Sequence, residues 1–486
     1  MAQPPAKISY INKSYEDERN ALLARAPIVS HGTWTDLNNS ELLLAFAELM
    51  LGSSDMIKFY MDHQANESFL QTARERKNVI ANSNQLSHRM KSWSPASGYV
   101  SVKLTNKING YISIPKYTKF WSRSGLPYFS TTEMFLSEGI PFADVPLLQG
   151  LVKTVTYTST GEASQKFLIN SALIGEGSIT VSIDSILWEC VDNNFILSGV
   201  GSQDYTLEIL SNGNMYVVFG DGVFGAIPTT NASIIITWAD TQGPLGNMDE
   251  NLIVRFDEDP DNVAIQYSSN FSGGSVPETI EEAKKLAPML LRSVWKADTK
   301  DDFAALTEDY PGVQQAGVLD INDFPLYSFR ISYHEVWVVV IPSGGGTMSD
   351  SMRNAIYNYL EERKYTTCNL QVINAEYVSV DIDVTVYKKS NYDEQVIESA
   401  VTDAVTNLFI IATSPIAQYR MYGTVDGLVL GEDLRYSDVV TAINSLPGVS
   451  YIQMSSPTSD VMVNSQQIPI LGNLTLNILN AVEVIE

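Results

Sequence analysis

Three kinds of hydrophobic pattern follow one another along the chain of 486 residues. Apolar residues at helical spacing dominate residues 42–81, a period of two replaces them from residue 98 to residue 270, and strands alternate with amphipathic helices afterwards. We therefore predict a multidomain α+β protein. Its predicted parts are an extended arm at 1–36, a helical segment at 37–95, an all-β domain at 96–272, and two α/β modules at 273–375 and 376–486.

The helical segment is unusually apolar at its start. Asn38 and Glu41 form a capping-box signal, and Leu42–Leu51 is apolar nearly all round, which indicates burial on more than one side. Gly52–Asp55 predicts a break before a second helix. A small helical segment cannot cover so wide an apolar surface, so we expect a partner to cover it. The residues predicted to form this interface are Leu42, Leu43, Leu44, Phe46, Leu49, Met50, Phe69 and Leu70.

The all-β domain contains a clear hairpin near the middle of the chain. Tyr205–Leu210 and Met215–Phe219 flank Asn212-Gly213, which tolerates the positive φ angles of a tight turn. With a third run, Ser233–Trp238, they predict a three-stranded meander. Earlier strands of the same sandwich or barrel are predicted at Tyr99–Leu104, Tyr111–Ile114, Thr154–Thr158, Lys166–Ile169, Thr180–Ile183 and Phe195–Leu197.

A glycine motif after the hairpin resembles a nucleotide-binding fingerprint. Gly220, Gly222 and Gly225 spell G-x-G-x-x-G after a strand, but that fingerprint needs a helix next, whose N-terminus faces a pyrophosphate. Here Pro228 and another β-type run follow, and Asp221 would face the phosphates. We therefore predict a structural turn formed by these five residues, with no nucleotide cofactor.

The C-terminal modules begin with strong helix signals. Gly273-Gly274 predicts a hinge, Ser275 with Glu278 predicts a capping box, and Thr299 with Asp302 predicts a second one. Further along, Val336–Ile341 is apolar throughout, so we expect a strand buried on both faces.

A similar unit occurs once in each predicted module. Pro311–Val313 and Pro447–Val449 share the residues Pro-Gly-Val, each between an amphipathic helix and a strand. Asp302 and Asp438 precede these turns by the same interval. The pattern fits either two related modules or a coincidence of turn chemistry.

Composition narrows the choice of partners. Lys and Arg number 31 against 56 Asp and Glu, a formal charge of −25, which disfavours nucleic acid and anionic membranes. Cys190 and Cys368 are too few and too far apart for a disulfide scaffold, so we expect free thiols in a reducing cytoplasm. We also expect a soluble protein, since no apolar run reaches membrane-spanning length and the N-terminus has no signal-peptide pattern.

Candidate catalytic groups do not form a recognisable set. Asp257–Asp261 is acidic, but an EF-hand loop starting there would need Gly and Glu where Asn262 and Ser268 stand, so we predict a solvated turn or an adventitious cation. Carboxylate pairs such as Asp301-Asp302 are expected by chance in so acidic a chain. We predict no cofactor, no metal site and no enzymatic activity. The scattered histidines are His31, His63, His88 and His334.

Several of these stretches together resemble one protein family. FGDGVFGAIP at residues 219–228, Thr241-Gln242-Gly243 with Gly246-Asn247, and YMD…NESFLQTAR at residues 60–74 are similar to motifs of the baseplate J-like family. The start of the first α/β module resembles the family too, although Trp295 stands where the family often has Arg. Members are baseplate wedge subunits in the contractile tails of bacteriophages.

The resemblance implies a structural role in the virion. Two copies of such a subunit commonly join another wedge protein through a helical bundle, and wedges close into a ring around the hub whose rearrangement triggers sheath contraction. It therefore implies, as partners, a second copy, another wedge protein, and hub or sheath-proximal proteins. The implied location is the tail baseplate, assembled in the host bacterial cytoplasm.

Two other classes remain open at this point. The central β domain and its aromatic residues would also suit a receptor-binding or carbohydrate-binding tail module, which glycan binding by a trimer would favour. A cell-wall-degrading enzyme would reveal itself on a peptidoglycan zymogram.

Overall fold

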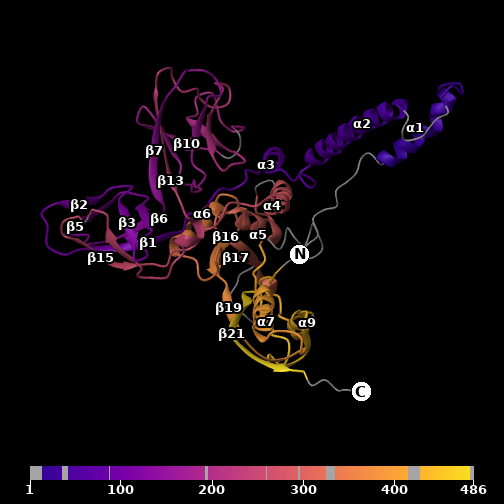
Figure 1. The fold of residues 1–486 in the computed structure, drawn as a ribbon. Helices are drawn as coiled ribbons and strands as arrows, with labels where there is room; N and C mark the ends of the chain where they lie inside the picture. Colours follow the sequence, from indigo (N-terminus) through magenta and orange to yellow (C-terminus); the bar gives the residue numbers. More distant parts are fainter. Residues whose placement is uncertain are drawn as a thin grey trace. The chain divides into compact units, whose positions relative to one another are not determined.

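The structure is a computed structural model that describes residues 14–34, 42–86, 88–191, 195–258, 260–293, 296–323, 334–413 and 427–481. The chain divides into two compact units, Met1–Leu86 and Ser87–Glu486, which are described separately below. N-terminal helices, a large β region and mixed α/β modules occur along the chain as predicted (Figure 1).

The described part of the first unit contains three helices, α1 (Tyr15–Val29), α2 (Leu42–Glu67) and α3 (Arg76–Gln85). The prediction of an extended arm over residues 1–36 is therefore wrong for residues 15–29, which form α1. Ser14 and Asp17 form a capping box there: the Asp17 amide donates to Ser14 Oγ at 3.2 Å, and the Ser14 amide donates to Asp17 Oδ2 at 3.1 Å. Capping supplies partners for the first free amides of a helix, and Pro27 comes too late to prevent its start.

The break predicted at Gly52–Asp55 is also wrong, because α2 is continuous through this stretch. A glycine inside a helix costs only about 1 kcal/mol relative to alanine, and the flanking residues favour helix. The Ser53 hydroxyl donates to the Leu49 carbonyl at 3.1 Å, so the polar side chain is satisfied within the helix. The predicted cap at Asn38 and Glu41 lies outside the described residues.

In the second unit, the β region forms two main sheets rather than one continuous one. The first has six strands in the order β14-β3-β4-β6-β1-β15, and its core includes Phe120, Tyr128 and Leu147. Its strands are β1 (Ser97–Leu104), β3 (Lys119–Ser122), β4 (Pro127–Ser130), β6 (Phe142–Gln149), β14 (Ile253–Phe256) and β15 (Val263–Ser268), and a separate pair is formed by β2 (Tyr111–Ile114) and β5 (Met134–Ser137).

The second sheet has seven strands in the order β7-β13-β9-β10-β11-β12-β8. Its strands are β7 (Leu151–Thr158), β8 (Lys166–Ile169), β9 (Thr180–Ile183), β10 (Ile186–Cys190), β11 (Asp204–Ile209), β12 (Met215–Phe219) and β13 (Ser233–Asp240). The predicted hairpin is β11–β12, and Gly213 in its turn has φ +88°.

Two predictions in this sheet are wrong. The three-stranded meander fails because β13 pairs with β7 and β9 instead of β12, a non-local pairing that a local pattern cannot reveal. The strand predicted at Phe195–Leu197 is a turn, in which Phe195 has φ +64° and its carbonyl accepts the Ser198 amide at 3.0 Å. Ile196 and Leu197 are exposed, so their apolar character does not indicate burial in a sheet.

The first α/β module is built on a three-stranded sheet in the order β16-β17-β18. The central strand β17 contains the predicted apolar run, and Val338–Ile341 is completely buried, as expected for a strand covered on both faces. Its elements are α4 (Ile280–Ser293), α5 (Lys300–Asp309), β16 (Val313–Leu319), β17 (Glu335–Pro342), α6 (Asp350–Glu361) and β18 (Asn369–Asn374).

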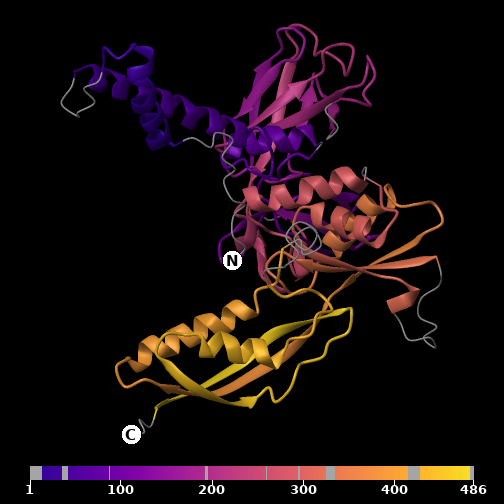
Figure 2. The same cartoon turned by 90° about the vertical axis from the view of Figure 1, so that its right-hand side faces the viewer.

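The second module has the sheet order β20-β19-β21, and α7 and α9 cover one of its faces (Figure 2). In both modules the central strand is antiparallel to one neighbour and parallel to the other. The chain order differs, because the central strand follows the Pro-Gly-Val strand in the first module and precedes it in the second. Its elements are β19 (Glu376–Lys388), α7 (Glu394–Leu408), α9 (Tyr436–Asn444), β20 (Val449–Ser456) and β21 (Gln467–Asn480).

Candidate assembly interface

Helix α2 carries its more polar side chains on the face that is covered within its own unit. The less exposed positions recur at helical spacing, at residues 44, 47, 48, 51, 54, 58 and 62. Two ion pairs join this face to α1, one between Arg19 Nε and Glu48 Oε1 at 2.6 Å and one between Lys58 and Glu18. Of the large apolar residues on this face, Leu44 is fully buried.

The opposite face of α2 holds most of its large apolar side chains, and solvent reaches all of them. Each is between 58% and 77% exposed, and at about 100° per residue they cover roughly 140° of the helix surface. We call these residues the outward face of α2: Leu42, Phe46, Leu49, Met50, Met56, Ile57, Tyr60 and Met61. Most soluble helices show the reverse arrangement, with the apolar face turned inward.

The spacing of the outward face also fits a helical partner. Several of its positions are separated alternately by four and three residues, the repeat that brings side chains into the seam between packed helices. The residues on this seam are Leu42, Phe46, Leu49, Ser53, Met56 and Tyr60. Complete burial of one large apolar side chain contributes about 1.5–3 kcal/mol relative to its exposed state, so a partner helix here would gain considerable free energy.

The predicted interface residues divide into three groups. Leu42, Phe46, Leu49 and Met50 belong to the outward face, and Phe69, just beyond the end of α2, is 59% exposed. Leu44 and Leu70 are buried and pack the unit itself. The side chain of Leu43 lies outside the described part of the structure. That these residues bind a partner stays a prediction.

The sequence prediction missed the C-terminal half of the outward face. The break predicted at Gly52–Asp55 places Met56, Ile57, Tyr60 and Met61 on a separate helix. The four-three spacing continues through this stretch and was the signal that could have joined the two halves.

The motif that follows α2 has a structural role. Both oxygens of the buried Glu67 carboxylate accept backbone amides, from Arg74 at 2.9 Å and from Glu75 at 3.2 Å, and Asn78 Nδ2 donates to it at 2.8 Å. Burial raises the pKa of Glu67, but these donors outweigh burial and lower the pKa below its ordinary value. Glu67 therefore fixes the turn between α2 and α3.

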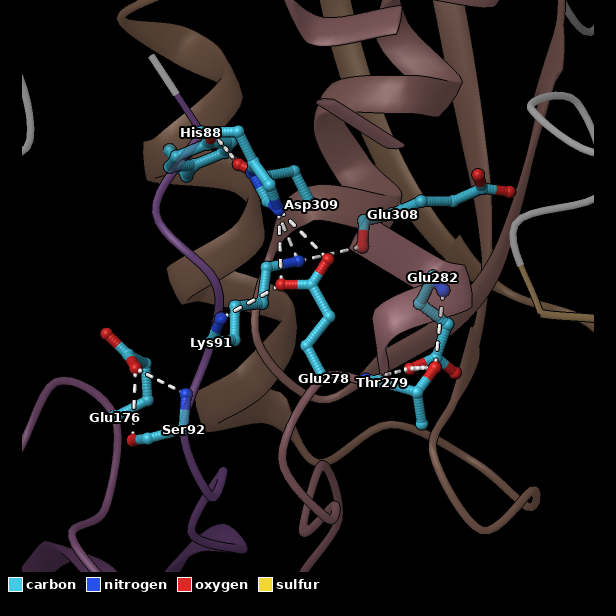
Figure 3. A network of polar contacts seen from close by, with 10 residues as sticks. His88, Lys91, Ser92, Glu176, Glu278, Thr279, Glu282, Glu308 and Asp309 are labelled. Atoms are coloured by element: carbon cyan, nitrogen blue, oxygen red, sulfur yellow. Dashed lines mark hydrogen bonds and ion pairs between the residues drawn. The ribbon is translucent and has the colours of Figure 1, made fainter. Parts of the chain in front are cut away.

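At the start of the second unit, residues 88–97 run between several elements, and we call them the strap. His88 is almost completely buried, and its Nε2 lies 2.9 and 3.1 Å from the two Glu278 oxygens (Figure 3). The Lys91 amide donates to Glu278 at 2.9 Å, and Lys91 Nζ lies 3.2 Å from Asp309 Oδ1. Asp309 Oδ1 is also 3.6 Å from His88 Nδ1. The strap is thus held to the start of α4 and to the end of α5.

The same strap is held to the seven-stranded sheet by a second buried carboxylate. Glu176 pairs with Arg89. It also accepts the amide of Ser92 at 3.1 Å (Figure 3). Trp93 Nε1 donates to the Ala172 carbonyl at 2.9 Å. A backbone bridge from Trp93 to Gly175 completes this attachment, while Ser94 and Ser97 pair with residues 275 and 272 in the segment before α4.

Charge pairing dominates the electrostatics of the strap. Burial lowers the pKa of His88, but the Glu278 carboxylate outweighs this effect and the net shift is upward. Burial raises the pKa values of Glu278 and Glu176, and the cations His88 and Arg89 outweigh it, so both pKa values lie below the ordinary one. Each partner therefore favours the charged form of the other, His88 with Glu278 and Arg89 with Glu176.

The predicted role of Glu278 as a helix cap is wrong. Helix α4 is capped by Thr279, whose side chain accepts the Glu282 amide at 3.2 Å while the Glu282 carboxylate accepts the Thr279 amide at 2.8 Å. Glu278, one residue earlier, turns to the strap instead. The predicted box at Thr299 and Asp302 is confirmed, with both of its hydrogen bonds present.

The predicted hinge at Gly273-Gly274 is a tight backbone contact. The Gly274 amide donates to Asn247 Oδ1 at 2.8 Å, and Asn247 Nδ2 donates to the carbonyls of Gly274 at 3.0 Å and Ser343 at 3.1 Å. A Cβ on Gly274 would lie 2.2 Å from the Gly243 carbonyl oxygen. Glycine is required here for close approach, and the hydrogen bonds fix the backbone.

The glycine motif lies in a loop between two strands. No helix follows the motif: residues 220–232 lead from β12 to β13, and Gly222 and Gly225 have φ angles of +86° and +78°. Asp221 accepts two amides of this loop, and Pro228 accepts a hydrogen bond from Ser159 at its carbonyl. The geometry is that of a turn, without the strand–helix context that a nucleotide site needs.

Within the residues that the structure describes, no three His, Cys, Asp or Glu side chains are placed to share a metal ion. None of the helices that it describes combines the length and apolarity needed to cross a membrane. The Asp257 carboxylate accepts a hydrogen bond from Trp121 Nε1 at 2.8 Å.

Comparison with known proteins identifies two segments. Residues 14–84 match the family described as "Bacteriophage baseplate protein, N-terminal domain", and residues 380–477 match "Baseplate J-like protein C-terminal domain". No curated protein matches the chain. The first match includes α2 with its outward face, and the second includes most of β19 and all of α7, α9 and β20.

Two solved assemblies show weak structural similarity. A chain of the anti-feeding prophage baseplate is 13% identical, with 94% of this chain and 90% of that chain covered and a TM-score of 0.34. A chain of the type VI secretion TssK-TssF-TssG baseplate subcomplex is 7% identical, with 68% and 96% covered and a TM-score of 0.28. Similarities this weak do not establish a shared fold.

Proposed function

We propose that this chain, which carries a bacteriophage baseplate N-terminal domain and a Baseplate J-like C-terminal domain, is a wedge subunit of a contractile-tail baseplate. The two domain matches support a structural role in a phage tail baseplate. The finer proposal adds that the chain joins a second copy of itself and another wedge protein, and that these wedges surround the tail hub and take part in triggering sheath contraction. No catalytic step is included in this role.

The outward face of α2 is the observation that carries the proposal. Its large apolar side chains are exposed, whereas the face covered within the unit contains ion pairs such as Arg19–Glu48. A chain that functioned alone would gain by burying the apolar face and exposing the charged one. The observed arrangement favours a helical bundle in which partner helices cover the outward face.

Co-expression with the proteins encoded beside it in the phage tail region tests this role. In Ile57→Asp, a carboxylate replaces an apolar side chain that is 60% exposed in the chain alone. The substitution should leave the fold intact, because exposed positions usually change stability by no more than about 0.5 kcal/mol. It should weaken partner binding about 100-fold or more, because an unpaired charge would be buried.

A matched control places the same charge elsewhere in the unit. Asn20→Asp adds a carboxylate at an exposed position of α1 and should co-purify partners like the wild type. Equal recovery of partners by Ile57→Asp and Asn20→Asp would contradict the proposed bundle.

A further inference from the structure

Two loops at one end of the seven-stranded sheet are joined by their backbones. One, residues 195–202, precedes β11, and the other, residues 220–226, follows β12. The Gly225 amide donates to the Gly199 carbonyl at 3.2 Å, and the Ala226 amide donates to the Ser202 carbonyl at 2.8 Å. The loops therefore form one surface, which we call the two-loop platform.

The platform is held in one conformation by its own hydrogen bonds and glycines. One Asp221 oxygen accepts the amides of Val223 at 2.8 Å and Phe224 at 2.7 Å, and these two bonds lower the pKa of Asp221. A Cβ on Gly220 would lie 2.4 Å from the Gly225 carbonyl, so these glycines allow a close approach. The Phe195 ring is only 9% exposed. It packs so close to Gly225 that a Cβ added there would lie 3.0 Å from the ring.

This fixed backbone presents apolar side chains to solvent. The exposed residues of the platform are Ile196 (69%), Leu197 (85%), Val200 (70%), Val223 (62%) and Phe224 (52%). Holding such side chains in water gives the isolated chain no stability. A surface that is ordered before binding loses little conformational entropy on binding, which suits a docking site.

Acidic side chains border the platform. Glu189 of β10 and Asp204 of β11 occupy adjacent positions on these two neighbouring strands, at the base of the first loop. Glu162 belongs to a third loop, whose Ser164 amide donates to the Gly220 carbonyl at 3.0 Å. Lys166, at the start of β8, already forms an ion pair with Glu208. The platform therefore combines an apolar centre with a border of negative charge.

We propose that the two-loop platform is a second docking surface, which binds an apolar pocket bordered by lysine or arginine on a different protein subunit. A second copy of this chain is a poor partner, because each copy carries a formal charge of −25 and would present the same acidic border. Anionic lipid is disfavoured for the same reason. The partner is a neighbour in the baseplate assembly, so this inference rests on the proposed function.

Site-specific photo-crosslinking in the co-expressed complex tests the proposal. A benzophenone amino acid at position 224 should crosslink to a different tail protein, within a segment that contains apolar residues and lysine or arginine. The control position is Asn212, which is exposed in the turn at the other end of the same hairpin and should give no such product. A crosslink from position 224 to another copy of this chain, to lipid or to nothing would overturn the proposal.

Affinity measurements with the crosslinked subunit provide an independent test. Val223→Ser combined with Phe224→Ser should weaken binding at least about tenfold, since interface energy concentrates in a few buried apolar side chains. Binding should also weaken as salt is raised, because the acidic border is complementary to a basic one. Asn212→Ser should bind like the wild type, and an unchanged affinity of the double variant would refute the docking role.

The two surfaces can fail separately. Ile57→Asp removes the proposed helical partner and should leave the crosslink from position 224 in place. If Ile57→Asp retains all partners while the crosslink forms as expected, the helical bundle is wrong and the platform stands. If Ile57→Asp loses its partner and position 224 gives no crosslink, the bundle stands and the platform is wrong.

Discussion

Neutralising Glu278 should release the strap from the first α/β module. The Glu278 carboxylate is buried, lies 2.9 Å from His88 Nε2 and accepts the Lys91 amide at 2.9 Å. Removing one partner of a buried ion pair costs about 3–5 kcal/mol. Glu278→Gln keeps the side chain's size and some of its hydrogen bonds, so we expect the lower end of this range, about 3 kcal/mol.

Hydrogen–deuterium exchange of a peptide covering residues 88–96 measures this cost locally. A loss of about 3 kcal/mol raises the population of the open strap, and hence its exchange rate, roughly 10²-fold. The control is Glu282→Gln, which alters the cap of α4 without touching the strap and should leave exchange in residues 88–96 unchanged. In a double-mutant cycle, Glu278→Gln and His88→Gln should be non-additive by about 1 kcal/mol or more.

The result that refutes this reasoning is specific. If Glu278→Gln speeds exchange no more than Glu282→Gln does, the buried pair does not hold the strap. Strict additivity with His88→Gln would show that the two side chains act independently despite their contact.

Three further predictions concern local chemistry. The pKa of His88 is raised above its ordinary value of 6.5. The ion pair therefore stabilises the folded state fully below pH 6.5, and this stabilisation is lost as the pH rises through the raised pKa. The urea unfolding midpoints of the wild type and His88→Gln should consequently converge at high pH. Gly274→Ala should prevent folding of the second unit, because the added Cβ would clash with the Gly243 carbonyl. A Cβ added at Gly52 meets no other atom, so Gly52→Ala should stabilise the protein against thermal unfolding by roughly 0.5–1 kcal/mol. Glu67→Ala leaves amides without acceptors and should cost about 1–3 kcal/mol, seen as faster proteolysis near residue 74.

Local signals in the sequence predicted the elements that local chemistry decides. Asn212-Gly213 marked the hairpin turn, and the Thr299–Asp302 box marked the start of α5. The apolar run in β17 marked a central strand. In each case the residues that determine the structure are neighbours in the chain.

Features that depend on distant residues were not predictable in this way. Glu278 matched the pattern of a cap, and its true partner His88 lies 190 residues earlier. The pairing of β13 with β7 and β9 likewise depends on strands that are far apart in the chain. At α2 the difficulty was different: Gly52 suggests a break although the four-three spacing continues through it, and the continuous helix shows that both apolar runs share one face.

The most direct test of the central claim is the reactivity of a thiol on the outward face of α2 before and after assembly. In a Cys190→Ser background, Ile57→Cys places a thiol on the outward face, and Asp55→Cys places one at an exposed position on another side of the same helix. Both thiols should react rapidly with maleimide in the isolated chain. In the assembled wedge, we expect position 57 to be protected at least about tenfold while position 55 stays reactive. Equal reactivity of the two positions in the assembly would contradict the claim that partner helices cover this face.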